Sequence, residues 1–85
     1  MEIIFKETAL EDRDYFKASG NKIIQKRISE LIEDIVEHPY FGKGKPEPLK
    51  YELSGCWSRR ITDEHRIVYK VANDNLYIIS LKGHY

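Results

Sequence analysis

The strongest pattern in the chain is a stripe of apolar residues that returns every three to four positions between residues 24 and 35. The stripe consists of Ile24, Ile28, Leu31, Ile32 and Ile35. Lysine, arginine and glutamate fill most positions between them, which is typical of a helix with one buried face. Asn21 is placed to cap the start of this helix. His38-Pro39 ends it, because the residue before a proline disfavours helical geometry.

Two shorter elements are predicted before this helix. The segment "EIIFK" (2–6) predicts a strand. Thr8 followed by Glu11 fits a capping box, which predicts a first helix from about Ala9 to Lys17. The sequence Ser19-Gly20-Asn21 then separates the two helices.

The hydrophobic period changes from helical to alternating after a loop rich in glycine, proline and lysine, "YFGKGKPEP" (40–48). Apolar and polar residues alternate in "LKYELSG" and "CWSRRIT", then in "HRIVYKV", and "NLYIISL" follows. The alternating positions are Leu49, Tyr51 and Leu53 in the first segment, and Trp57, Arg59 and Ile61 in the second. With turns at Asp63-Glu64 and Asn73-Asp74, the pattern predicts about four antiparallel strands.

This order of elements predicts an α+β fold. Two N-terminal helices would pack on one face of a twisted, mainly antiparallel sheet of about five strands, and the other face would be free to bind a ligand. The 85 residues, 41% hydrophobic and 33% charged, fit one globular domain over residues 1–85.

The composition also limits the cellular setting. No apolar run approaches the ~20 residues that span a bilayer, and the acidic start lacks the pattern of a signal peptide. Cys56 is the single cysteine, which excludes an intramolecular disulfide and a metal site built on paired thiolates. We therefore expect a cytoplasmic protein with no membrane partner.

The formal net charge of zero hides an asymmetry between the two halves of the chain. Residues 1–42 carry six Lys/Arg and nine Asp/Glu, whereas residues 43–85 carry eight and five. A cationic second half indicates an anionic ligand, with ordinary surface charge as the alternative.

The loop "GKGKPEPLK" gathers three lysines and one glutamate, namely Lys43, Lys45, Glu47 and Lys50. Pro46 and Pro48 fix the backbone on both sides of Glu47, which lowers the entropy lost in aiming its carboxylate. Nearby lysines favour the ionised carboxylate, so Glu47 is a candidate general base. A solvated loop with turn prolines is the alternative.

Three arginines occupy the predicted strand pair, and their arrangement depends on the turn between the strands. A three-residue turn at Thr62–Glu64 puts Arg60 opposite Arg66, whereas a two-residue turn puts Arg59 beside Arg66. The sequence leaves both registers open. Because like charges opposite each other destabilise a sheet, such a face suits an anion, and guanidinium groups suit phosphate. Simple solvation of an exposed strand is the alternative.

The sequence closes on His84 and Tyr85. An imidazole, a carboxylate and several cations are the groups that move protons and stabilise charge at a phosphodiester. A mobile surface histidine is the alternative. No HxxxH or CxxC spacing occurs, so we expect neither a catalytic metal nor another cofactor.

Several of these segments together resemble one family of bacterial toxins. "GKPEPLK", "LSGCWSRRI", "DEHRIVY" and the final His84-Tyr85 resemble the YoeB/Txe family within the wider RelE-like group, and the resemblance covers nearly the whole chain. It implies the toxin of a toxin–antitoxin pair: a ribosome-dependent endoribonuclease, or messenger-RNA interferase. Such an enzyme cuts messenger RNA in the A site without a metal, by attack of the ribose 2′-OH, and thereby inhibits translation.

The resemblance also implies roles for individual residues. It assigns Glu47 as general base, His84 as general acid and Arg66 as the group that stabilises the transition state. Further matching positions are Tyr85, needed for full activity, and Lys50 and Arg60, which help to hold phosphate. We add Lys43, Lys45 and Arg59 as candidate phosphate-binding residues because of their charge and position.

The implied partners are a YefM-like antitoxin, the 70S ribosome with messenger RNA in its A site, and a second copy of the chain in a homodimer. Operator DNA would be contacted only through the antitoxin complex. Two rival functions stay open. One is a non-catalytic RNA- or ribosome-binding module, which would gain nothing from the Glu47 carboxylate. The other is a gyrase-inhibiting ParE-like toxin, a group that lacks the set Glu47, Arg66 and His84.

Overall fold

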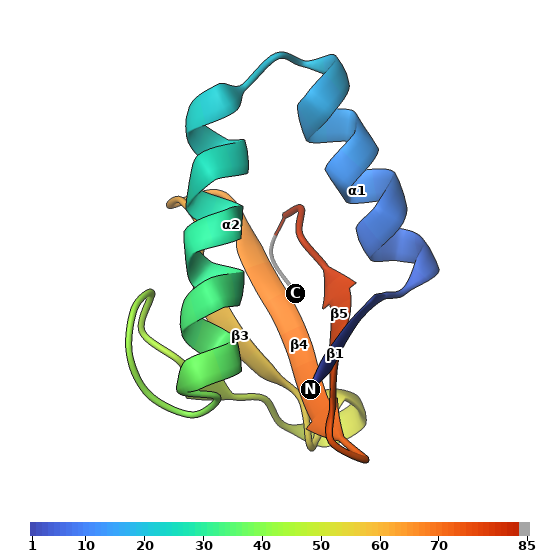
Figure 1. Cartoon of the computed structure of the whole chain (residues 1–85), viewed down its shortest axis with the longest axis vertical. Helices are drawn as coiled ribbons and strands as arrows, with labels where there is room; N and C mark the ends of the chain where they lie inside the picture. The colour runs from blue at the N-terminus through green and yellow to red at the C-terminus, as the bar shows by residue number, and fades with distance from the viewer. Residues whose placement is uncertain (84–85) are drawn as a thin grey trace.

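The computed structural model describes residues 1–83, so the predicted site residues His84 and Tyr85 lie outside the described part of the chain. The elements are β1 (Glu2–Phe5), α1 (Glu7–Ala18), α2 (Lys22–Glu37), β2 (Glu47–Pro48), a 3₁₀ turn (Tyr51–Leu53), β3 (Trp57–Arg60), β4 (Arg66–Ala72) and β5 (Asn75–Ser80). Figure 1 shows α2 lying in front of β3 and β4 and α1 beside the end of β5, with a short turn joining the two helices.

The five strands form one mixed sheet in the order β1-β5-β4-β3-β2. β1 pairs with β5 in parallel, and every other neighbouring pair is antiparallel. The predicted α+β fold is confirmed. The first and last strands of the sequence lie side by side, as Figure 1 also shows.

The apolar stripe of α2 is buried as the sequence predicts. Ile28, Leu31 and Ile35 pack with apolar residues of β4 and β5 in the core. The predicted cap is confirmed, because the Asn21 side chain accepts a hydrogen bond from the backbone N–H of Ile24 at 3.1 Å. The helix ends at Glu37, directly before the His38-Pro39 pair.

The start of α1 differs from the prediction. The helix begins at Glu7, and Thr8 lies inside its first turn, so the predicted capping box is wrong. Lys6 occupies the N-cap position without a side-chain cap, and its backbone N–H donates to the carbonyl of Ile78 at 2.9 Å. The helix therefore begins directly after β1, and the pairing of β1 with β5 determines which residue starts the helix.

The segment "LKYELSG" is not the predicted strand. It folds into the 3₁₀ turn, in which Tyr51 has a φ of 59° and an exposed side chain. The backbone N–H of Leu49 donates to the carbonyl of Cys56 at 2.9 Å, which closes a loop between these residues. The chain must reverse here to bring β2 beside β3, and this reversal overrides the alternating pattern.

The structure decides the register that the sequence left open. Arg60 on β3 is paired with Arg66 on β4, and Ile61 donates to the carbonyl of His65 at 3.0 Å across the turn. This register is that of the three-residue turn. The next turn lies at Asn73-Asp74 as predicted, with positive φ values of 53° and 61°.

Candidate functional site

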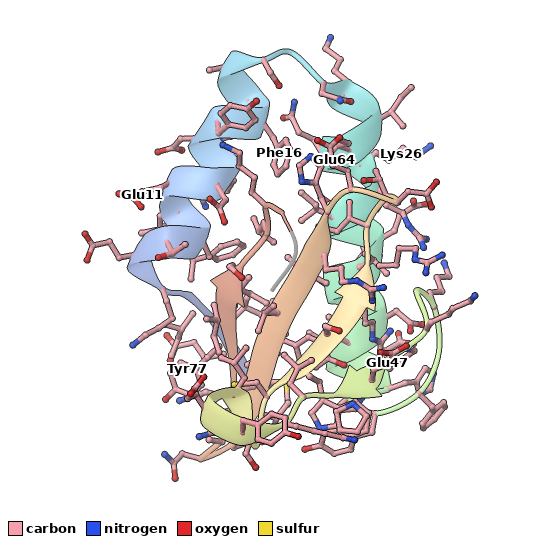
Figure 2. The ribbon with its side chains drawn as sticks, turned by 180° about the vertical axis from the view of Figure 1, so that it is seen from behind. Glu11, Phe16, Lys26, Glu47, Glu64 and Tyr77 are labelled. Carbon is pink, nitrogen blue, oxygen red and sulfur yellow. The ribbon has the colours of Figure 1, made fainter. Side chains whose placement is uncertain are left out.

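The face of the sheet turned away from the helices carries three of the predicted site residues, Glu47, Arg60 and Arg66. Side chains alternate between the faces of a strand, and paired residues share a face. Ile67, Tyr69 and Ile78 belong to the core, so their neighbours along β4 and β5 lie on the opposite face. We call this the uncovered face because neither helix packs on it, and the register places on it Glu47, Ser58, Arg60, Arg66, Val68, Lys70 and Tyr77. Ser58 and Val68 are nevertheless buried. Figure 2 views the molecule from behind, with Glu47 beside β3 and Tyr77 well apart from it.

Glu47 and Arg66 are brought together by this register although they are 19 positions apart in the sequence. Glu47 pairs with Ser58, which pairs with Val68, and Arg66 lies two residues from Val68 along β4. Strand spacings of about 4.8 Å and a rise of about 3.4 Å per residue put the two Cα atoms roughly 12 Å apart. Two long side chains on one face can reach a ribose and its phosphate across that distance.

The segment that carries Glu47 is fixed to β3 at both ends. The carbonyl of Gly44 accepts from the N–H of Arg60 at 2.7 Å, and the N–H of Leu49 donates to the carbonyl of Cys56 at 2.9 Å. Lys45, between these anchors, has a φ of 53°, a conformation that non-glycine residues adopt only when their surroundings impose it. A carboxylate on such a segment is aimed by the scaffold rather than by a flexible loop.

Gly44 is required where this segment crosses α2 and β3. Its φ is 79°, and an added Cβ atom would lie 2.9 Å from Leu31 Cδ2 and 3.1 Å from both Arg59 Cβ and the Arg60 carbonyl oxygen. Both the backbone conformation and the lack of space exclude a side chain here. The sequence "GKGK" therefore holds the Glu47 segment close against the fold.

Arg59 does not belong to the phosphate-binding surface, and the prediction that it does is wrong. Its side chain is fully buried on the helix side of the sheet. Its guanidinium donates to the Asp34 carboxylate at 2.5 Å and Nε donates to the Tyr69 hydroxyl at 3.2 Å. The remaining acceptors are the backbone carbonyls of His38, Phe41 and Lys43. With its donors occupied in this way, Arg59 secures the loop that leads to Glu47.

The pKa values of the two polar partners of Arg59 fit this structural role. The hydrogen bond from Arg59 lowers the pKa of Asp34 below its ordinary 3.8, against the opposing effect of burial, and the N–H of Lys43 adds to the lowering. Burial raises the pKa of Tyr69 above 10.0, so its hydroxyl stays protonated and donates to the Pro39 carbonyl at 2.6 Å.

The other predicted cations face solvent. Lys43, Lys45 and Lys50 are exposed. The Arg60 side chain is 42% exposed and lies 4.0 Å from the Asp63 carboxylate, a separation at which the attraction is weak. Neither Arg66 nor Glu47 has an ion-pair partner among residues 1–83, so both remain available to a ligand.

The chain after β5 returns to Arg66. Asp12 Oδ2 accepts from the N–H groups of Leu81 and Lys82 at 2.9 and 3.1 Å. Gly83 donates to His65 Nδ1 at 2.8 Å, and its carbonyl accepts from the N–H of Arg66 at 3.2 Å. Sequence reasoning missed the contribution of Asp12, because no periodic signal links it to residues 69 and 70 positions away.

The described residues contain neither a metal-binding group nor a membrane-spanning helix. Within residues 1–83, no three His, Cys, Asp or Glu side chains come together as a metal-binding group. None of the helices in that part of the chain is long and apolar enough to cross a membrane. The prediction that catalysis needs no metal stays a prediction.

Comparison with known proteins gives a consistent family assignment. Residues 5–85 match the family model of the YoeB-like toxin of bacterial type II toxin–antitoxin systems. Toxin YoeB of Escherichia coli K12 is 49% identical over the full length of both chains. Two Staphylococcus aureus structures cover 100% of this chain and 98% of theirs: a YoeB–YefM complex, 44% identical with a TM-score of 0.89, and a YoeB dimer, 43% identical with a TM-score of 0.90.

Proposed function

Because this chain belongs to the YoeB-like toxin family of bacterial type II toxin–antitoxin systems, we propose that it is a ribosome-dependent endoribonuclease that cuts messenger RNA in the A site. One observation carries the proposal: the register puts Glu47 and Arg66 on the same uncovered face. The backbone of Gly83, which directly precedes His84, is bonded to the Arg66 N–H. A base and a cation therefore share one face of the sheet, and the chain that leads to the proposed acid is hydrogen-bonded to the backbone of that cation.

The proposed reaction is transesterification at one RNA linkage. Glu47 takes the proton of the ribose 2′-OH, and the 2′-oxygen attacks the adjacent phosphorus. The bond from phosphorus to the 5′-oxygen breaks, which leaves a 2′,3′-cyclic phosphate and a 5′-hydroxyl. His84, as the imidazolium, gives its proton to the departing 5′-oxygen, and Tyr85 supports this step.

The cations act on the charge that develops during this reaction. Arg66 stabilises the phosphoryl oxygens in the transition state, with Arg60 and Lys50 as further ligands of the phosphate. Lys43 and Lys45 extend the cationic surface along the RNA. Arg59 takes no part, because its buried guanidinium is paired with Asp34 and hydrogen-bonded to the backbone carbonyl of Phe41.

The proposed partners follow from the relatives. The Staphylococcus aureus complex joins YoeB to YefM, and a second structure is a YoeB dimer. We propose that this chain, as a single toxin domain of the bacterial cytoplasm, is likewise inhibited by a YefM-like antitoxin and can form a homodimer. It would bind the 70S ribosome when free, and operator DNA only within the antitoxin complex.

The decisive variant is Glu47→Gln, which keeps the size of the side chain and removes the base. In a translating extract, wild-type protein is expected to produce message 5′ ends clustered at A-site codons. Glu47→Gln should lower the single-turnover cleavage rate by about 10²–10⁴-fold, the usual contribution of a general base. Ribosome binding should persist. Glu52→Gln, an exposed glutamate of the nearby 3₁₀ turn, is the matched control.

The same assay separates the rival functions. Cleavage by Glu47→Gln at the wild-type rate would show that Glu47 is not the general base. Undiminished cutting of a message with 2′-deoxyribose at the cut site would exclude attack by the 2′-OH. Ribosome binding without any new 5′ ends would identify a non-catalytic binding module. Inhibition of gyrase supercoiling in place of message cleavage would identify a ParE-like toxin.

A further inference from the structure

The segment that follows β5 is held by two side chains from distant parts of the chain. Asp12 on α1 accepts from the backbone N–H groups of Leu81 and Lys82 through the same oxygen, Oδ2. Successive N–H groups of an extended strand point in opposite directions, so a single acceptor can serve both only where the chain turns out of the strand. Asp12 therefore fixes the direction that the chain takes after Ser80.

His65 holds the next residue. Its Nδ1 atom lies 2.8 Å from the backbone nitrogen of Gly83, which donates the hydrogen, so the geometry assigns the lone pair of the imidazole to Nδ1. The ring is 5.1 Å from the ring of Phe16, in an edge-to-face contact, and Phe16 is 2% exposed. A buried aromatic of α1 thus orients the imidazole that receives Gly83.

The two contacts direct the chain to Arg66. The Gly83 carbonyl accepts from the Arg66 N–H at 3.2 Å, next to the pair formed by Arg60 and Arg66. Lys82 adds a contact on the way, since its Nζ atom lies 3.7 Å from the ring centre of Tyr15 on α1. The segment 81–83 is therefore hydrogen-bonded at each of its three residues, and its last residue lies beside the backbone of Arg66.

We propose that Asp12 and His65 are positioning residues for cleavage: together they form a latch that fixes the path of residues 81–83, which directly precede the proposed general acid in the sequence. This inference rests on the proposed function, because it concerns the acid that follows Gly83. Neither side chain is required to touch RNA. Their effect is to hold the three preceding residues in one path, and small displacements of a catalytic group lower rates steeply.

A purely structural role would make a different prediction. If Asp12 and His65 only satisfied buried backbone groups, their loss would lower stability and leave the saturating rate of the folded protein unchanged. A positioning role lowers that rate while ribosome affinity is kept. The distinction therefore requires variants that alter the latch in a controlled manner.

The chain allows such variants. Asp12→Ala removes the acceptor of the Leu81 and Lys82 N–H groups, and Asp14→Ala, two residues away on α1 and exposed, is the matched control for charge and helix propensity. His65→Phe keeps an aromatic ring against Phe16 and removes Nδ1. Asp12→Asn and His65→Asn retain an oxygen near the original acceptor atom and serve as the conservative rescues.

The first measurement is independent of activity. Amide hydrogen exchange of Leu81, Lys82 and Gly83 is followed by NMR in the free protein. Asp12→Ala should speed exchange at Leu81 and Lys82 at least tenfold, and His65→Phe should do so at Gly83. Asp14→Ala and both Asn variants should remain near wild type. Unchanged exchange in Asp12→Ala and His65→Phe would overturn the latch itself.

The second measurement is single-turnover cleavage on programmed ribosomes across a range of toxin concentrations. Asp12→Ala and His65→Phe should lower the saturating rate ten- to hundredfold with the half-saturating concentration unchanged, and the Asn variants should recover most of the loss. Faster exchange with a wild-type saturating rate would overturn the positioning role. Failure of the wild-type protein to cleave at all would instead reject the proposed function, and the inference about the acid with it, whatever the exchange rates.

Discussion

Arg59 and Arg60 are adjacent in sequence and identical in chemistry, yet the side chain of Arg59 is fully buried and that of Arg60 is 42% exposed. Alternation along β3 turns them to opposite faces of the sheet. A buried guanidinium is tolerated only when its donors are satisfied, and Arg59 meets this condition with Asp34, Tyr69 and three backbone carbonyls.

The Asp34–Arg59 pair predicts a specific dependence of stability on pH. Because Arg59 lowers the pKa of Asp34 in the folded state, the stabilisation is complete above the ordinary pKa of 3.8 that the group has in the unfolded chain. It is lost as pH falls through the lower folded pKa. Asp34→Asn should reduce the free energy of unfolding by about 1–3 kcal/mol at pH 7. It should also flatten the decline in stability below about pH 4.

Urea unfolding at a series of pH values between 7 and 2 measures both effects. Asp14→Asn, an exposed carboxylate on α1, is the control and should leave the pH dependence close to that of the wild type. An Asp34→Asn protein that lost stability on acidification as steeply as the wild type would contradict the assigned role of the pair.

The alternating pattern of β3 predicts that Arg59 points into the core, whereas its charge suggests an exposed position. Arg59 alternates with Trp57 and Ile61, which is the pattern of an inward-facing position. Its charge and its position next to Arg60 instead favour a surface position, and the structure follows the alternation. Its partner Asp34 lies on α2, 25 residues earlier, and only the packed helix reveals the pair. Glu47 and Arg66 could be selected from local sequence, whereas their shared face required the register.

The hairpin between β4 and β5 rests on an unusual pair of turn residues. Asn73 and Asp74 both have positive φ, as the two-residue turns that match the twist of paired strands require. Asparagine tolerates this conformation better than most residues, and glycine adopts it without strain. The turn therefore stores a small amount of strain at Asp74.

Replacing Asp74 by glycine should relieve that strain. Asp74→Gly creates the Asn-Gly pair preferred in such turns and should raise the free energy of unfolding by about 0.5–1 kcal/mol. Thermal and urea unfolding measure the change. Ser54→Gly, at an exposed position with a φ of −55°, is the control and should not stabilise. A less stable Asp74→Gly protein would show that the aspartate side chain contributes more than its backbone strain costs.

Helices and strands were predictable where the apolar positions of the sequence pattern are buried in the core. The stripe of α2 and the alternation of β4 each meet a buried face, and both elements form as expected. The segment 49–53 also alternates but has no buried face to pack against, so the loop closed by Leu49 and Cys56 decides its conformation. Periodicity predicts an element only when the fold offers a surface for the apolar positions.

At the scale of the whole molecule, the neutral net charge separates into an acidic first half and a cationic second half. Glu30, Glu33 and Glu37 lie on α2, whereas the exposed lysines around Glu47 belong to the second half. Binding to RNA through those lysines should release counterions, so affinity should fall steeply with salt.

Salt dependence tests this arrangement. The double variant Lys45→Gln and Lys50→Gln should reduce the slope of log affinity against log salt for programmed ribosomes by about 0.7–0.9 per lost phosphate contact. Lys26→Gln removes a lysine from α2, apart from Glu47 in Figure 2, and should leave the slope unchanged. Equal slopes for the double variant and the wild type would exclude these lysines from RNA contact.

The two edge strands of the sheet differ in length. On one side the outermost strand is β2, only two residues long and containing Pro48, which has no N–H to offer. On the other side is β1, four residues long, and among residues 1–83 no strand is paired with its outer edge. A second copy could pair with the β1 edge strand, whereas the β2 edge on the opposite side of the sheet offers little backbone for pairing. If copies joined through their β1 edges, only the short β2 edges would be left at the two ends, which disfavours extension into a continuous sheet.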